Sequence, residues 1–232
     1  MVSKTKEKEL AIQLRKQGKS YSEIRRIIPV AKSTLSIWFR EVHLSKRQEQ
    51  KITIKRIEAQ KRGAEAKRKQ RLEKTKTIKN IARREVTSLI KNPLWIVGVV
   101  IYWAEGAKEK EWRVSEKTKI SNMDPHIHKI FISWAKRFLK ISSDRFIYEL
   151  YIHPTGDIFN SKKYWSKQLH VSTKKIRVYF KKPNHNPKKY NTRENYHGVL
   201  TTMITKGTDV NRKIAGWVEG MIDFLSKNSG IV

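Results

Sequence analysis

Cysteine is absent from this 232-residue chain, and so is any long hydrophobic run. The first absence excludes disulfide bridges, thiolate zinc sites and a cysteine nucleophile, and it permits a reducing intracellular compartment. A transmembrane helix needs about 20 consecutive apolar residues, and the start MVSKTKEKEL holds no apolar signal region. We therefore expect no membrane partner and a cytoplasmic protein, associated with the nucleoid if the cell is prokaryotic.

Acidic residues are scarce as well: 21 Asp and Glu stand against 52 Lys and Arg, which gives a formal net charge of +31. Such an excess of positive charge predicts a polyanionic partner, and nucleic acid is the first hypothesis. The apolar share of 38% supports a packed core, and the 7 Trp, 8 Tyr and 7 Phe argue against a histone-like tail. We expect a globular protein that binds double-stranded DNA.

Residues 1–44 have the pattern of a small helical domain. Gly18 predicts the end of a first helix, Ser20 and Glu23 match a capping box that begins a second, and Pro29 ends the second. A third helix follows at once. The side chains expected to face the core of the second and third helices are Ile24, Ile27, Ile28, Leu35, Trp38 and Phe39.

The third of these segments, VAKSTLSIWFR (30–40), resembles the recognition helix of resolvase- and transposase-type helix-turn-helix domains. The resemblance implies that the start of this helix enters the major groove, where short polar and basic side chains reach base edges. The expected DNA contacts are Lys32, Ser33, Thr34, Ser36 and Arg40. The alternative is a three-helix packing unit that binds no ligand.

Residues 45–90 are strongly basic and have the composition of a solvated helix. Positions 44–85 contain 16 Lys and Arg but only 5 Glu, so we expect a basic helical or partly disordered linker that neutralises phosphates without reading sequence. Near its end apolar residues recur at helical spacing, and this part should pack on the following domain. These residues are Ile78, Ala82, Val86 and Leu89.

Residues 91–232 alternate helix and strand signals and predict an α+β domain. Asp124 and Pro125 match the cap and first turn of a helix. The expected helices cover about 93–105, 125–140, 158–169 and 210–225, and the expected strands lie within 112–122 and at 146–153, 175–181 and 196–205.

A glutamate ends the most hydrophobic of these helices, in the stretch GVVIYWAEGAK (98–108). Gly98 and Glu105 are seven residues apart and share one stripe of a helix. A glycine on that stripe would let a partner helix approach, and Gly106 is a suitable C-terminal cap. Two carboxylates brought together in this way, facing a polyanion, favour a divalent cation between them, as in metal-assisted phosphodiester hydrolysis.

The nine residues GVVIYWAEG are similar to the LAGLIDADG signature of homing endonucleases in apolar character, in the alanine, in the acid and in the final glycine. The resemblance implies signature helices that pair across a dimer or pseudo-dimer, Mg²⁺ or another divalent cation at the helix ends, and twisted antiparallel sheets that saddle DNA. Carried over, Glu105 is the catalytic metal ligand, the Gly106 carbonyl assists it, and Lys108 lies near the scissile phosphate. The helix at 158–169 departs from the family order αββαββα.

A second candidate acid is Glu219, in KIAGWVEGMI (213–222), which repeats the wording W-x-E-G. Only 12 residues follow Gly220, too few for another copy of the fold, so a structural role for this glutamate is favoured. A homodimer that supplies one Glu105 per subunit is therefore expected.

Three functions remain open. The favoured hypothesis is a sequence-specific, metal-dependent DNA endonuclease, and the alternatives are a non-cleaving DNA-binding regulator or architectural protein of the same fold and an RNA-binding protein. A histidine nuclease built on His126 and His128 is disfavoured, because positions two apart diverge on a helix. A basic segment near the C-terminal strands adds expected phosphate contacts at Lys181, Lys182, Lys188, Lys189 and Arg193.

Overall fold

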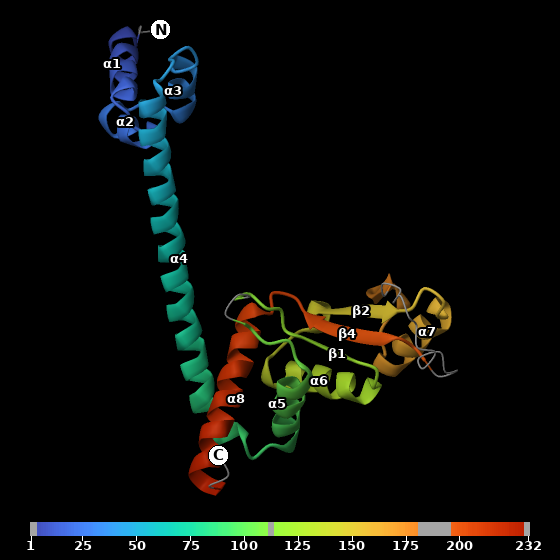
Figure 1. Cartoon of the computed structure of the whole chain (residues 1–232). Coiled ribbons are helices and arrows are strands. Elements are labelled where there is room, and N and C mark those ends of the chain that lie inside the picture. The colour runs from blue at the N-terminus through green and yellow to red at the C-terminus, as the bar shows by residue number, and fades with distance from the viewer. Residues whose placement is uncertain (1–3, 111–113, 181–195, 230–232) are drawn as a thin grey trace. The chain divides into compact units, whose positions relative to one another are not determined.

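The computed structural model describes residues 4–110, 114–180 and 196–229, and its helices and strands confirm the α+β class (Figure 1). The chain divides into two compact units, residues 1–72 and 73–232. Helix α4 (Lys46–Leu89) is continuous across this division, so the basic segment contributes to both units. Among the described residues, no helix combines the length and the apolar character that crossing a membrane would require.

The first unit contains three short helices, α1 (Thr5–Lys16), α2 (Tyr21–Ile27) and α3 (Lys32–Trp38), and the start of α4. Their core is formed by Ala11, Ile24, Ile28, Val30, Leu35 and Phe39. The prediction that Ile27 faces this core was wrong, because its side chain is 54% exposed. Helix α2 ends at this residue and the backbone is extended at Ile28, which turns Ile28 rather than Ile27 inward.

The predicted capping box begins α2. The Ser20 hydroxyl accepts a hydrogen bond from the Glu23 backbone N–H, and the Ser20 backbone N–H donates to the Glu23 carboxylate at 2.6 Å. The Lys55 ammonium donates to the same carboxylate at 2.9 Å. The bond from the Ser20 backbone, followed by that from Lys55, lowers the pKa of Glu23 from 4.5 to about 2.

This lowered pKa predicts a pH-dependent contribution to stability. Glu23 binds its proton more weakly in the folded state, so its contribution is complete at neutral pH and disappears as the pH falls from about 4.5 to about 2. We expect Glu23→Gln to lower the Tm at pH 7 and to have a much smaller effect near pH 2, as followed by circular dichroism. A Tm difference that stays constant over this range would contradict the assignment.

The second unit contains a four-stranded sheet of β1 (Lys119–Asn122), β2 (Phe146–Ile152), β3 (Ile176–Phe180) and β4 (Val199–Ile204), in the order β1-β4-β2-β3. Strand β4 is antiparallel to both neighbours, whereas β2 and β3 are parallel. The expectation of a purely antiparallel sheet was therefore wrong. Helix α7 (Ile158–Leu169) joins β2 to β3, and such a crossover returns the chain in the same direction.

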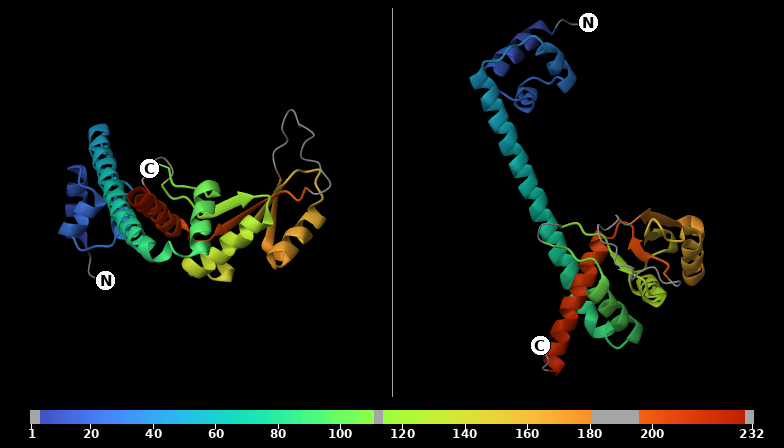
Figure 2. Two further views of the ribbon diagram at one scale, coloured as in Figure 1. Left: turned by 90° about the horizontal axis from the view of Figure 1, so that it is seen from below. Right: turned by 45° about the vertical axis from the view of Figure 1, so that its right-hand side comes forward.

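The remaining helices are α5 (Pro93–Glu105), α6 (Pro125–Phe138) and α8 (Thr208–Ser229), with single 3₁₀ turns at Ser143–Arg145 and Thr173–Lys175. Helices α6 and α7 lie along one face of the sheet (Figure 2), where β2 buries every second side chain. Three buried tryptophans join α5, α6 and α8: Trp217 makes edge contacts with Trp95 and Trp134 at 5.7 and 5.9 Å.

The end of α4 packs on the domain that follows it, as its apolar spacing predicted, and the element it contacts there is α8. Ala82 and Val86 are buried, and a Cβ at Gly216 or Gly220 would lie 2.8 Å from Ala82 or Val86, respectively. Both glycines are thus needed for close helix contact. The Trp217 indole N–H also donates to the Glu85 carboxylate of α4 at 2.8 Å.

Candidate functional site

Helix α5 carries the predicted signature, and local chemistry sets both of its ends. The Asn92 side chain accepts hydrogen bonds from the backbone N–H groups of Leu94 and Trp95, and Pro93 occupies the first turn. The helix ends at Gly106, as predicted, but this residue is extended rather than left-handed. Glycine is required there because a Cβ would overlap the carbonyl oxygen and the ring of Tyr102.

Gly98 makes room for a side chain of its own chain. The expectation that it makes room for the helix of a partner subunit was therefore wrong. Gly98 is buried, and a Cβ there would overlap the Trp134 ring of α6. Trp134 is fully buried beside Tyr102 and Phe131. The close approach that glycine permits is therefore the contact between α5 and α6.

A different side of α5 is apolar and exposed. Val97 and Val100, one turn apart, are 42% and 43% exposed, and Trp103 is 44% exposed. Ala104, also exposed, continues the row toward the C-terminal end of the helix. We call these four residues the outer face of α5. An exposed apolar row on an otherwise buried helix is typical of an interface.

Glu105 comes directly after Ala104 in the chain, but at helical spacing it lies on the stripe of Gly98 rather than in this row. Its side chain is exposed, and it makes no hydrogen bond or ion pair with another residue of the described ranges. Lys108 is exposed too, and its ammonium lies 3.4 Å from the Ala104 carbonyl oxygen. The end of α5 thus carries a carboxylate and an ammonium that are both open to a ligand.

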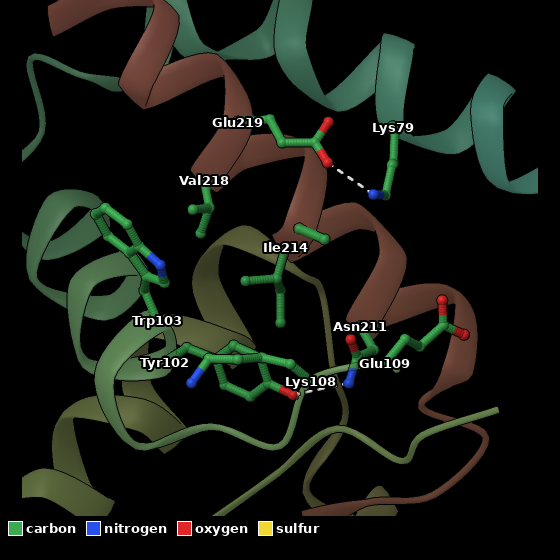
Figure 3. Close-up of a pocket in the computed structure, with 10 residues that line it drawn as sticks. Lys79, Tyr102, Trp103, Lys108, Glu109, Asn211, Ile214, Val218 and Glu219 are labelled. Atoms are coloured by element: carbon green, nitrogen blue, oxygen red, sulfur yellow. Dashed lines mark hydrogen bonds and ion pairs between the residues drawn. The ribbon is translucent and has the colours of Figure 1, made fainter. Parts of the chain in front are cut away.

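Lys108 and Glu219 both line a pocket of about 220 Å³ between α4, α5 and α8 (Figure 3). Glu219 forms ion pairs with Lys79 at 2.7 Å and Arg83 at 3.2 Å. These pairs hold α8 against α4. The carboxylate of Glu219 therefore has two cationic partners, whereas Glu105 has none within the described ranges.

The chain after Glu105 is held in place by buried polar contacts. The Asn211 amide donates to the Tyr102 hydroxyl at 3.0 Å (Figure 3). The Tyr102 hydroxyl and the Asn211 amide both donate to the Ala107 carbonyl oxygen, each at 2.7 Å. Burial raises the pKa of Tyr102, so it remains a neutral donor. The buried Arg212 guanidinium adds bonds to Glu109, Asp209 and the Val114 carbonyl. These contacts fix the position of Gly106 and Lys108.

The side chains predicted to contact DNA lie on the outside of α3. Lys32, Ser33, Ser36 and Arg40 are exposed and Thr34 is partly exposed, while Leu35 is fully buried. The helix therefore presents its polar side outward. The other predicted contacts, Lys181, Lys182, Lys188, Lys189 and Arg193, lie outside the described residues.

The sheet brings together polar and aromatic side chains that the sequence analysis missed. On the face opposite α6 and α7, Arg177 lies beside Glu149, and Tyr179 lies beside Tyr151 with ring centroids 5.3 Å apart. Lys119, across from Met203, shares this face. We call these residues the outer face of the sheet. Strand alternation could have identified the tyrosines, but strand pairing alone decides which residues become neighbours.

His126 and His128 do not form a shared site. His128 is buried, with its ring nitrogens 2.8 Å from the Thr202 hydroxyl and 3.2 Å from the Asn122 carbonyl. Burial lowers the pKa of His128. His126 is exposed and pairs with Asp124 at 3.0 Å. The two rings thus have separate structural partners.

The end of α5 offers one side chain, that of Glu105, of the kind that binds a divalent cation. Within the described ranges, no three His, Asp or Glu side chains of one chain gather around a common point. Glu105 nevertheless offers hard oxygen ligands without an internal partner, and oxygen ligands suit Mg²⁺. Comparisons with protein-family models, curated proteins and solved structures found no match to this chain.

Proposed function

We propose that this protein is a sequence-specific, divalent-metal-dependent endonuclease of double-stranded DNA, with a LAGLIDADG-like second unit. The observation that carries the proposal is the exposed carboxylate of Glu105, which has no partner among the described residues, at the end of a helix whose outer face is apolar and exposed. A structural acid pairs with an opposite charge, as the half-buried Glu219 does. Glu105 differs from other exposed acids in its place at the end of this apolar helix, where a bound cation would supply the opposite charge.

Sequence recognition is assigned to α3. Its exposed side comprises short hydroxyls at Ser33 and Ser36 and the ammonium of Lys32, and the exposed Arg40 follows just after the helix. Hydroxyl and guanidinium groups of this kind hydrogen-bond to base edges in the major groove. The exposed lysines and arginines of α4 then neutralise phosphates, which adds affinity that falls with salt.

The outer face of the sheet is assigned to the DNA backbone. Arg177 and Tyr179 are exposed there, and Lys119 is partly exposed. A guanidinium and an ammonium pair with phosphates, while the stacked tyrosine rings offer flat apolar contacts to sugars. The DNA would thereby be held by the second unit as well as by the recognition helix.

Mg²⁺ would be held by Glu105, with the backbone carbonyl of Gly106 beside it. When bound, such a cation stabilises negative charge on the attacking and leaving oxygens and lowers the pKa of water. Glu105 positions the cation, and Lys108 places a positive charge near the scissile phosphate. The hydrogen bonds from Tyr102 and Asn211 to Ala107 keep the turn between these two residues rigid.

The active form is proposed to be a homodimer paired through the outer face of α5. Pairing would cover Val97, Val100 and Trp103 and bring together two helices that each end in Glu105. This differs from the contact first expected through Gly98. Each subunit would contribute one carboxylate, which completes a site that a single chain leaves half formed.

Val100→Glu tests the dimer. A carboxylate introduced into an apolar interface would be buried without a partner, so we expect a monomer by analytical ultracentrifugation and loss of cleavage. Met123→Glu is the matched control, because Met123 is 52% exposed and lies outside the outer face of α5. Cleavage at wild-type rate by a monomeric Val100→Glu protein would refute the requirement for two subunits.

The experiment that tests the function itself is selection from a library of duplex sites, with and without Mg²⁺. Cut products that depend on both metal and site sequence would support the endonuclease. Site-selective binding without cutting would favour the non-cleaving regulator. Preferential binding of single-stranded RNA over duplex DNA would overturn both.

A further inference from the structure

A basic groove lies on the side of the sheet that faces the helices, opposite the outer face of the sheet. It has a volume of about 610 Å³ and lies between α6, the end of α7 and the two 3₁₀ turns. Lys129, Lys136 and Lys175 contribute to its wall, and none of its lining residues in the described ranges is acidic. The groove therefore concentrates positive charge in a concave site.

The floor of this groove contains a tyrosine hydroxyl that has no partner in the described part of the chain. Tyr148 of β2 lines the groove and is only 4% exposed, yet its hydroxyl makes no hydrogen bond with any other described residue. The hydroxyl oxygen is not sealed off, so a molecule in the groove can reach it. Burial also raises the pKa of Tyr148, so the group is a neutral O–H that can donate to an anion.

The rest of the groove wall is partly apolar and leaves room for an organic group next to an anion. Lys129 crosses from α6 to donate to the Gln168 side chain at 2.8 Å, which closes one side without neutralising the ammonium. The backbone at His170 is left-handed, with φ of 52°, and turns the chain so that Val171 joins the wall. Leu169 and Ile132 add further apolar surface. The space exceeds the size of a bare phosphate.

We propose that this groove binds a small phosphorylated ligand of nucleotide size. The phosphate lies among the three lysines and accepts a hydrogen bond from the Tyr148 hydroxyl, and the organic part contacts the apolar wall. Three ammonium groups suit the charge of a phosphomonoester. The site is independent of DNA cleavage, since Tyr148 faces the helices whereas Tyr151 of the same strand faces the other side.

Calorimetric titration of the full-length protein with AMP tests the proposal, with adenosine as the probe that lacks a phosphate. We expect Tyr148→Phe to weaken AMP binding about tenfold, the loss typical of one hydrogen bond to a charged group. Tyr151→Phe, a matched change on the opposite face, should leave AMP binding unchanged. Adenosine should bind at least about tenfold more weakly than AMP.

A second pair of variants distinguishes loss of AMP binding from loss of folding. Lys136 is exposed, so Lys136→Gln should weaken AMP binding without lowering the Tm, whereas Lys163→Gln on the exposed side of α7 should not weaken it. Equal AMP affinity of Tyr148→Phe and Tyr151→Phe, or equal binding of AMP and adenosine, would overturn the proposal. Selection of DNA sites by the Tyr148→Phe protein is expected to be normal, which separates this test from that of the proposed function.

Discussion

Glu105→Gln is expected to abolish Mg²⁺-dependent cleavage and to leave DNA binding intact. The substitution keeps the size of the side chain but removes the charge that holds the cation. Loss of even an outer-shell partner of a metal ligand costs about 10- to 100-fold in activity or affinity, so we expect a loss of at least about 100-fold for a direct ligand. The measurement is the rate of cutting of a selected duplex at saturating protein.

Glu58→Gln is the matched control, because Glu58 is an exposed glutamate of α4 outside the proposed site. This variant should cut at the wild-type rate. Because Glu105 has no partner among the described residues, its replacement should not lower the Tm. Unchanged cutting by Glu105→Gln would remove this residue from the mechanism, whereas equal loss of cutting and of DNA affinity would show that it acts in binding.

Gly98→Ala and Gly63→Ala are expected to change stability in opposite directions. Both replace a glycine inside a helix, which by itself favours the variant by about 0.5–1 kcal/mol. A Cβ at Gly63 has nothing within 4 Å, so that gain should be realised. A Cβ at Gly98 would overlap the ring of Trp134, which is fully buried and has no free space to move into.

Overpacking of this kind costs about 1–3 kcal/mol and sometimes more. We therefore expect Gly98→Ala to destabilise the second unit by about 2 kcal/mol. Chemical denaturation checks this value, followed by tryptophan fluorescence, since Trp95, Trp134, Trp165 and Trp217 are all buried in that unit. An unchanged unfolding midpoint for Gly98→Ala would mean that α5 and α6 are not in the close contact described.

For Gly98, the sequence predicted the position on the helix but not the residue that it contacts. Seven-residue spacing correctly placed Gly98 and Glu105 on one stripe of a helix, but it could not identify the neighbour on that stripe. The neighbour is Trp134, which lies 36 residues further along the chain in α6. The exposed row of Val97, Val100 and Trp103 was for the same reason not recognised as the outer side.

Local signals were more informative, because the atoms that satisfy them lie within a few residues. The capping box at Ser20, the cap at Asn92 before Pro93 and the cap at Asp124 before Pro125 each begin a helix. Only the first and the last of these caps were predicted as such. Hydrophobic spacing likewise predicted that the end of α4 packs against another element, although not that the element is α8.

The sequence by itself determined the helices and strands of this protein, its basic character and the position of one acid at the end of an apolar helix. These properties depend on side chains close together in the chain. The tertiary structure alone decided that β2 and β3 are parallel, that Glu219 is paired, and that Glu105 and Tyr148 have no partner among the residues the structure describes. Each of these three features depends on contacts between segments that are distant in sequence. Such contacts determine which side chains are buried and which are paired.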